Sequence, residues 1–271
     1  MIFLEKVHNQ LALSVIKPPE INSDSLGIGS YWVLGGLSSL LKSEVKHRVI
    51  GLDKNKDKAL CKAISGYVEM LAKVSQNKES DSDKHYRLHE GYAAYPALYP
   101  SGLEKCQENA YFEALEGFVW DSFWEDSSYG YTSEFYVDDL AKYLGFEFCK
   151  MIYPKINSDI VVAFAVGKVD AKGIVVGAGA SYCHKYATEK ACAEMSRNYL
   201  ILDRFADSLN TFDHQKSRCL ASLSQNGEAL YRKRCSFNSE RVLQIPEPEI
   251  DSFVSHSYEK LFHVWRTRLK A

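Results

Sequence analysis

Apolar side chains recur at helical spacing in five stretches of the chain. In the first, residues 57–74, Leu60, Ile64, Tyr67 and Val68 fall on one side of a helix. This spacing, near 3.6 residues per turn, predicts an amphipathic helix. The same pattern predicts four further helices, over residues 103–124, 137–144, 185–202 and 250–269. A glycine follows the third of these stretches, which is the residue type that commonly ends a helix.

Short apolar runs between these stretches predict strands. Three runs lie in the middle of the chain, over residues 146–153, 160–166 and 173–177, and another, 11–16, ends before two prolines. Residues 1–50 as a whole predict short strands and one helix. The polar run at 76–83 predicts a surface loop. Strands that alternate with long helices predict an α/β (α+β) fold in which helices cover the sheets.

Composition places the chain among ordinary folded proteins. It has 271 residues, 46% of them hydrophobic and 25% charged, and a formal net charge of −2, which excludes a disordered or fibrous chain. No apolar run reaches the roughly 18–20 residues of a membrane span. The near-neutral charge argues against nucleic-acid binding as the function. The first residues show no signal-peptide pattern, and the seven cysteines form no CxxC pair, so we expect a cytoplasmic protein with free thiols.

Three of the predicted helices share one pattern of small and polar residues. A small residue is followed by another four positions later, and polar positions follow three and six residues after that. Residues at i and i+4 lie on one helix face, so the small pair allows close packing against a neighbour. The two polar positions also share a face. The positions are Ala59, Ala63, Gly66 and Glu69; Cys106, Ala110, Glu113 and Glu116; and Ala187, Ala191, Glu194 and Arg197.

Taken in order, these motifs resemble the YcaO superfamily, ATP-dependent enzymes that modify peptide backbones. In that family, helices of the form A-x-x-x-A-x-x-E-x-x-E follow glycine-led segments. Here the glycine-led segments begin at Gly51, Gly91 and Gly177. The resemblance implies one YcaO-like domain over residues 1–271, with repeated strand–helix units, a recognisable core at 48–202 and a divergent C-terminal region at 203–271.

The resemblance also implies cofactors and a site. Such enzymes bind ATP without the G-x-x-x-x-G-K-[ST] loop, which this chain lacks, and hold Mg²⁺ through carboxylates, the oxygen ligands that this cation prefers. Carried over position by position, Glu69, Glu113, Glu116 and Glu194 would bind magnesium and ATP, and Arg197 would contact the nucleotide. No catalytic side chain is assigned. The family's reactions form azolines, thioamides or amidines in ribosomal peptides, as in cyclodehydratases and thioamidating enzymes.

The chain departs from the family pattern at several positions. Gly66 stands where the family has its first Glu, Arg197 where it has Gln, and Glu90 where it has Asn. A cation cannot ligate Mg²⁺, so at least one ligand position is lost or moved. Two hypotheses follow. The chain is either an enzyme that activates a peptide or protein amide, with a separate partner protein for recognition, or a catalytically degenerate scaffold subunit of a modification complex.

Three other features carry weaker alternatives. The basic stretch at 231–234 is either a solvated turn or a contact for an acidic partner. Residues 160–202 have the β-β-α order of a double-stranded-RNA-binding module, with Lys185 and Lys190, but lack its usual cluster of lysines at the helix start. Cys183 and His184 lie between a strand and a helix, where a metal or catalytic pair is conceivable and a helix-start histidine is the simpler interpretation.

Overall fold

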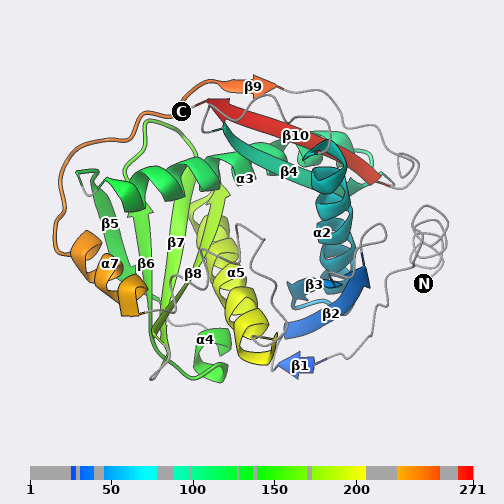
Figure 1. Cartoon of the computed structure of the whole chain (residues 1–271), viewed down its shortest axis with the longest axis horizontal. Coiled ribbons are helices and arrows are strands. Elements are labelled where there is room, and N and C mark those ends of the chain that lie inside the picture. Colours follow the sequence, from blue (N-terminus) through cyan, green and yellow to red (C-terminus); the bar gives the residue numbers. More distant parts are fainter. Residues whose placement is uncertain are drawn as a thin grey trace. The chain divides into compact units, whose positions relative to one another are not determined.

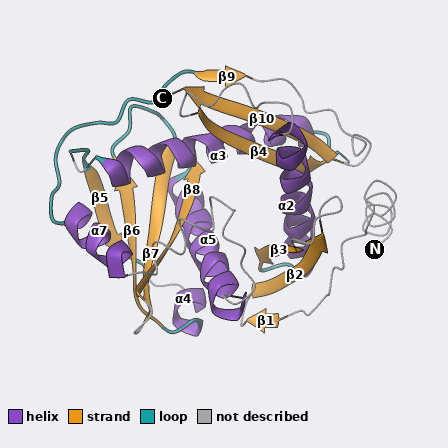
Figure 2. Ribbon diagram, in the orientation of Figure 1, coloured by secondary structure: helices purple, strands orange, loops and turns teal. Residues whose placement is uncertain are grey.

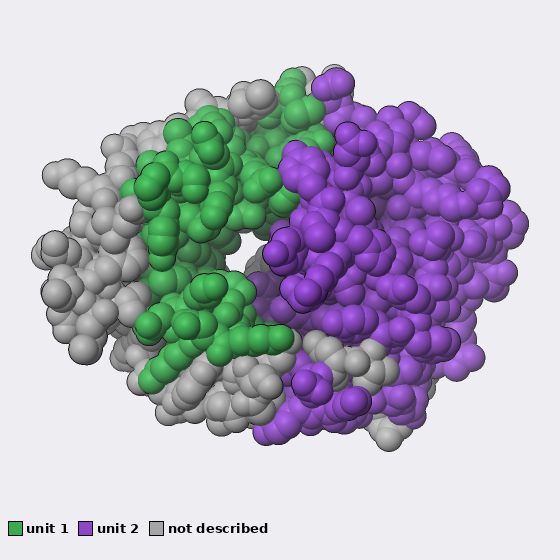
Figure 3. All heavy atoms as spheres, turned by 180° about the vertical axis from the view of Figure 1, so that it is seen from behind, with its two compact units in different colours: residues 1–114, 248–271 green, residues 115–247 purple. Residues whose placement is uncertain are grey.

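The computed structural model describes most of the chain, as ten segments. These are residues 26–28, 31–39, 46–77, 88–97, 99–126, 128–136, 139–169, 173–205, 225–250 and 262–270. The chain forms two compact units, one of residues 1–114 and 248–271 and the other of residues 115–247 (Figure 3).

The first unit holds two three-stranded antiparallel sheets (Figure 1). One sheet has the order β1 (Leu26–Ile28), β2 (Tyr31–Ser39), β3 (Lys46–Asp53). The other has the order β4 (Leu88–Pro96), β10 (Phe262–Lys270), β9 (Pro248–Ile250). Helix α2 (Lys56–Asn77) packs against β2 and β3 and also contacts β4. Helix α3 (Gly102–Glu125) begins in this unit and ends in the other.

The second unit is built on a four-stranded antiparallel meander. Its strands are β5 (Tyr131–Phe135), β6 (Phe146–Pro154), β7 (Val161–Val169) and β8 (Gly173–Ser181), paired in chain order. Helix α5 (His184–Phe205) lies along β8 and β7. Two shorter helices, α4 (Asp139–Tyr143) and α7 (Gln225–Cys235), complete the unit (Figure 2). Buried residues of the sheet, among them Met151 and Val175, pack against Ala191 and Met195 of α5 to form its core.

Most of the predicted elements are confirmed. Helices lie where the pattern at 57–74, 103–124 and 185–202 predicts them, and the three central strands are β6, β7 and β8. After α4, Gly145 adopts the left-handed conformation expected of a helix end, with φ of 72°. The predicted strand at 11–16 and residues 78–83 of the predicted loop lie outside the described residues, while residues 76 and 77 belong to α2. The mixed architecture confirms the α/β (α+β) class.

The predicted helix at 250–269 is wrong in its described part, and residues 251–261 lie outside the described residues. Residues 262–270 form strand β10, which pairs with β4 along its whole length, from Phe262↔Pro96 to Lys270↔Leu88. Alternate side chains of a strand face opposite sides of the sheet. Phe262 and Val264 are buried on one face and Thr267 and Leu269 on the other, while the residues between them are more exposed. Pairing with a distant segment, rather than local helical spacing, decides the structure here.

Two expectations from composition can be compared with the fold. The six described cysteines carry free thiols, and Cys106, Cys149 and Cys192 are buried, whereas Cys183 is exposed. None of the helices in the described part of the chain is long and apolar enough to span a bilayer.

Candidate functional site

Three strand–helix pairs pack main chain against main chain: β3 with α2, β4 with α3 and β8 with α5. A Cβ added to Gly51 of β3 would lie 1.8 Å from the carbonyl oxygen of Ala59 in α2, and one added to Gly91 of β4 would lie 1.9 Å from that of Ala110 in α3. Gly177 of β8 meets α5 in the same way, with a Cβ 2.1 Å from a backbone nitrogen. No real Cβ approaches so closely, so these strand positions require glycine. On the helix side, the contact involves both members of the small pair in α2 and the second member, Ala110 or Ala191, in α3 and α5.

In the first unit, two carboxylates face one edge of β4. The N–H of Ala94 donates a hydrogen bond of 2.9 Å to Glu69 Oε1 from α2, and the N–H of Tyr92 donates one of 2.9 Å to Glu113 Oε2 from α3. The two donors are two residues apart, so they point to the same side of the strand about 7 Å from each other. Strand β4 is the outer strand of its sheet, and these are N–H groups that β10 does not pair.

The second unit repeats the arrangement on β8. The N–H of Ala178 donates to Glu194 Oε2 from α5 at 3.3 Å, and the N–H of Ala180 donates to Glu116 Oε1 from α3 at 2.7 Å. These donors are again two residues apart on the outer strand of a sheet. Each outer strand therefore receives one carboxylate from the helix packed on its glycine and one from the preceding long helix.

The repeated helical pattern now has a geometric meaning. The polar position three residues after the second small residue reaches the helix's own strand, as Glu113 and Glu194 do. The position six residues after it reaches the next of these strands, as Glu69 and Glu116 do. The pattern thus supplies two carboxylates to β4 and two to β8.

The two departures from the repeated pattern lie in the first and the last of the three helices. Gly66 occupies the first polar position of the first helix, and Arg197 occupies the second polar position of the last. The guanidinium of Arg197 turns back and donates to Glu194 Oε1 at 3.1 Å. A second cation, Lys190, donates to Glu116 Oε1 at 2.8 Å. In the second unit, two carboxylates are thus matched by two resident cations.

Burial shapes the electrostatics of this pair. Removal from water raises the pKa of Glu194, the nearby Glu116 carboxylate acts in the same direction, and Arg197 and Lys190 oppose the shift. The side chain of Glu116 retains only 11% of its exposure, whereas that of Lys190 retains 42%. The carboxylates of Glu116 and Glu194 are therefore more buried than the cations with which they pair.

Sequence reasoning missed Lys190 as a member of this cluster. It treated that residue only as one of two lysines in a possible RNA-binding helix. A usable signal was present, because Lys190 precedes Glu194 by four residues and so lies on the same face of the helix. The β-β-α order of that alternative is real, since β7, β8 and α5 follow one another, but Lys190 is engaged with a carboxylate.

Glu90, which stands in place of the family's Asn, belongs to a different cluster. Its carboxylate accepts hydrogen bonds from Arg268 Nε at 2.9 Å and from the hydroxyl of Tyr92 at 3.1 Å, and Arg266 lies 4.0 Å away. Burial raises the pKa of Tyr92 to about 12. Glu90 thus forms ion pairs with Arg266 and Arg268 of β10, the strand that pairs with β4.

The four glutamates of the repeated pattern differ in how well they suit magnesium as ligands. Among the described residues, no three His, Cys, Asp or Glu side chains gather closely enough to hold a metal ion. Magnesium commonly uses only one or two carboxylates together with substrate phosphates and water. Glu69 and Glu113, each oriented by a backbone N–H, match that requirement, because ligating carboxylates are usually held by such outer hydrogen bonds. Glu116 and Glu194 already face Lys190 and Arg197.

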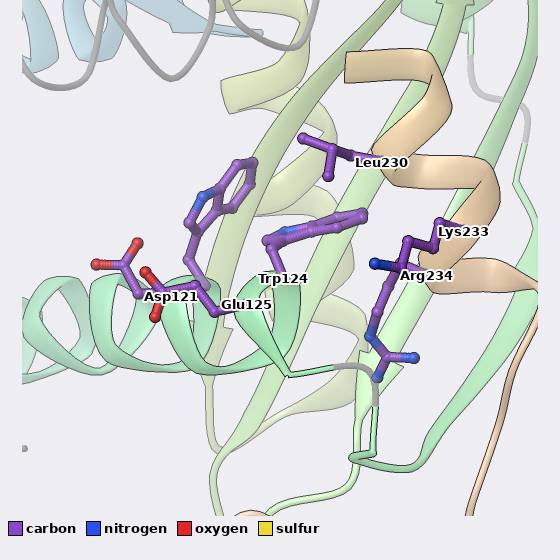
Figure 4. A pocket seen from close by; sticks show the side chains of 7 residues that line it. Asp121, Trp124, Glu125, Leu230, Lys233 and Arg234 are labelled. Carbon is purple, nitrogen blue, oxygen red and sulfur yellow. The ribbon is translucent and has the colours of Figure 1, made fainter. Parts of the chain in front are cut away.

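A pocket of about 430 Å³ lies in the second unit, between the end of α3 and α7 (Figure 4). Aromatic, acidic and basic side chains line it: Trp120, Asp121, Trp124, Glu125, Leu230, Lys233 and Arg234. It contains none of the carboxylates of the repeated pattern, so it is separate from the candidate site.

The basic stretch beside this pocket has a structural role at its last residue. Arg234 is 2% exposed, and it donates to the carbonyl oxygens of Phe123 at 2.8 Å and Tyr129 at 2.6 Å. Its guanidinium also stacks 3.6 Å from the centre of the Phe123 ring. The interpretation of this stretch as a solvated turn is therefore wrong, because residues 231–234 lie within helix α7 and Arg234 is buried, although Arg232 and Lys233 are exposed.

Comparisons with known proteins identify the fold. No protein-family model matches the sequence, and the search of curated proteins finds no match. Among solved structures, the chain is similar to YcaO from Methanopyrus kandleri, a structure bound with AMPPCP and Mg²⁺. The TM-score is 0.56 at 12% sequence identity, over 98% of this chain and 89% of that one. This likeness demonstrates a YcaO-like fold.

Proposed function

We propose that this chain binds ATP with Mg²⁺ and uses them to activate a backbone amide of a peptide or protein. The observation that carries the proposal is the pair of carboxylates on the edge of β4, Glu69 and Glu113, each oriented by a main-chain N–H. The fold likeness to a YcaO solved with AMPPCP and Mg²⁺ supports it. The products would be azolines, thioamides or amidines.

In this proposal the first unit supplies the magnesium ligands. Bound Mg-ATP would provide the phosphoryl group that makes an amide oxygen a leaving group. Glu113 is exposed and Glu69 is partly exposed, so both can be reached by a phosphate-bound cation. Their N–H partners hold one oxygen of each carboxylate in place.

A specific observation favours a second candidate, a YcaO-fold scaffold subunit without turnover. Lys190 and Arg197 face the carboxylates of the second unit, where the family resemblance leads one to expect metal ligands. A chain that has lost part of its metal site would retain the fold and a partner-binding role in a peptide-modification complex.

Substrate, partner and compartment are also parts of the proposal. The substrate is a ribosomal peptide or a protein, and a separate partner recognises it or delivers the nucleophile. A cytoplasmic location fits the free thiols of the six described cysteines.

Calorimetric titration of the full chain with ATP, with and without Mg²⁺, tests the first candidate. The variants are Glu69→Gln and Glu113→Gln. Glutamine still accepts the backbone N–H bond through its amide oxygen, but it lacks the negative charge that makes a carboxylate the stronger magnesium ligand, so the fold should be kept and the binding weakened. Glu108→Gln, at an exposed position on the same helix, is the matched control.

We expect magnesium-dependent ATP binding in the wild type and in Glu108→Gln, and at least a tenfold loss in Glu69→Gln and Glu113→Gln. Binding of equal strength in all four proteins would rule out this site assignment. No binding by the folded wild type at millimolar ATP would favour the scaffold, and affinity capture with the chain as bait would then seek the complex.

A further inference from the structure

The charged cluster of the second unit is complete without a metal ion. It contains the carboxylates of Glu116 and Glu194, the ammonium of Lys190 and the guanidinium of Arg197, so its formal charges sum to zero. The contacts are short, at 2.8 Å from Lys190 to Glu116 and 3.1 Å from Arg197 to Glu194. In addition, each carboxylate accepts one N–H of β8.

A divalent cation would have to compete for the same oxygen atoms. Glu116 Oε1 is shared by Ala180 N and Lys190 Nζ, while the two oxygens of Glu194 are divided between Ala178 N and Arg197. A metal ion bound there would lie close to two positive groups in a largely buried setting, where like charges repel strongly. It would also raise the local charge from zero to +2.

We propose that Lys190 and Arg197 take the place of a divalent cation on Glu116 and Glu194, so that the second unit is neutralised by its own side chains and binds no metal there. This inference refines the proposed function, since it assigns any magnesium of that function to the carboxylates of the first unit. It concerns the chain without nucleotide, so it can hold or fail independently of ATP binding.

Replacing the two cations should convert the cluster into a site for a divalent cation. In the double variant Lys190→Gln/Arg197→Gln, the two cations are replaced by amides whose oxygens are themselves hard-cation ligands. The cluster then has a formal charge of −2 and offers four oxygen-bearing side chains, those of Glu116, Glu194 and the two new glutamines. We expect this variant to gain a divalent-cation site that the wild type lacks.

The probe is Mn²⁺, titrated into the nucleotide-free full chain while the free ion is measured by electron paramagnetic resonance. The double variant should bind one Mn²⁺ more per chain than the wild type, and adding Glu116→Gln/Glu194→Gln to it should abolish that extra ion. Lys185→Gln, a neutralised lysine at an exposed position on the same helix, should bind as the wild type does.

Two results would overturn the proposal. One is a wild-type protein that loses a Mn²⁺ site when Glu116→Gln/Glu194→Gln is introduced, because the metal would then already occupy the cluster. The other is a folded double variant, judged by circular dichroism, that binds no additional ion. If the double variant does not fold, the comparison of the wild type with Glu116→Gln/Glu194→Gln still decides the first point. Loss of ATP binding alone would count against the proposed function and leave this inference intact.

Discussion

Gly91 lies against the main-chain carbonyl of Ala110, with no space between strand β4 and helix α3 for a methyl group. The same contact joins Gly51 to α2 and Gly177 to α5. Because backbone atoms sit on both sides, neither side can move aside by changing a rotamer. Close approach of the helix therefore requires glycine at one position in β3 and in β4 and at two positions in β8, Gly177 and Gly179.

Gly91→Ala should destabilise the protein severely. The added Cβ would lie 1.9 Å from the Ala110 oxygen, so helix and strand must separate, at a cost of about 3 kcal/mol or more by analogy with overpacked cores. Chemical denaturation measures the loss. Gly145→Asn is the control, because Gly145 has open space around its Cβ position and asparagine tolerates a positive φ. Equal stability of Gly91→Ala and the wild type would contradict the packing described.

Arg234→Lys should also lose stability, although it keeps the charge. Arg234 uses its planar fork to reach the carbonyl oxygens of Phe123 and Tyr129, which a single ammonium cannot do in the same geometry. We expect a loss of about 2 kcal/mol, because buried carbonyl groups are left without donors. Arg232→Lys, on the exposed face where Arg232 pairs with Glu228, should change stability by less than about 0.5 kcal/mol. A loss of the same size in both variants would argue against a special role for Arg234.

The Cys106 thiol should make stability fall at alkaline pH. Burial, and secondarily the Glu69 carboxylate, raise its pKa from 9.0 to about 12. The folded chain therefore retains the proton where the unfolded chain releases it, so this contribution to stability is full below pH 9 and is lost as the pH rises toward 12. Denaturation of the wild type and Cys106→Ala at several pH values should show the steeper decline in the wild type. Parallel curves would mean that the thiol titrates alike in both states.

Alkylation should distinguish the cysteines by their exposure. Cys183 is exposed just before α5 begins, whereas Cys106, Cys149 and Cys192 are buried. Iodoacetamide at neutral pH should modify Cys183 first, and the three buried thiols only after denaturation, because reaction needs an accessible thiolate. Peptide mass spectrometry after timed quenching measures this order. Early modification of Cys106 in the native protein would show that β4 and α3 separate readily.

The sequence predicts helices α2, α3 and α5 and strands β6 to β8 well, and strands β4 and β10 poorly. Helix α2 carries an apolar face that local spacing reveals, and the small pairs predict the tight packing seen at Gly91. Strand β4, however, reads Leu-His-Glu-Gly-Tyr-Ala-Ala-Tyr-Pro and has no β-branched residue, so its propensity for a strand is weak. Its partner β10 lies about 170 residues away in the chain, and no local pattern encodes that pairing.

The sequence offers candidate site residues but not their contacts. The resemblance to the YcaO superfamily points to Glu69, Glu113, Glu116 and Glu194, and the structure gives each of them a main-chain N–H donor. Which cation faces which carboxylate depends on how α3 and α5 lie around β8, which local sequence does not specify. The role of Lys190 therefore emerges only from the structure.

The carboxylates on β4 and β8 also close two sheet edges. An outer strand with unpaired N–H groups is a template for strand addition and aggregation. Here Tyr92 and Ala94, like Ala178 and Ala180, already donate to glutamate side chains, so an incoming strand finds those donors occupied and bulky side chains in its path. The same glutamates thus protect the folded protein against aggregation through its sheet edges. A chain of this fold would have this protection even if it never hydrolysed a nucleotide.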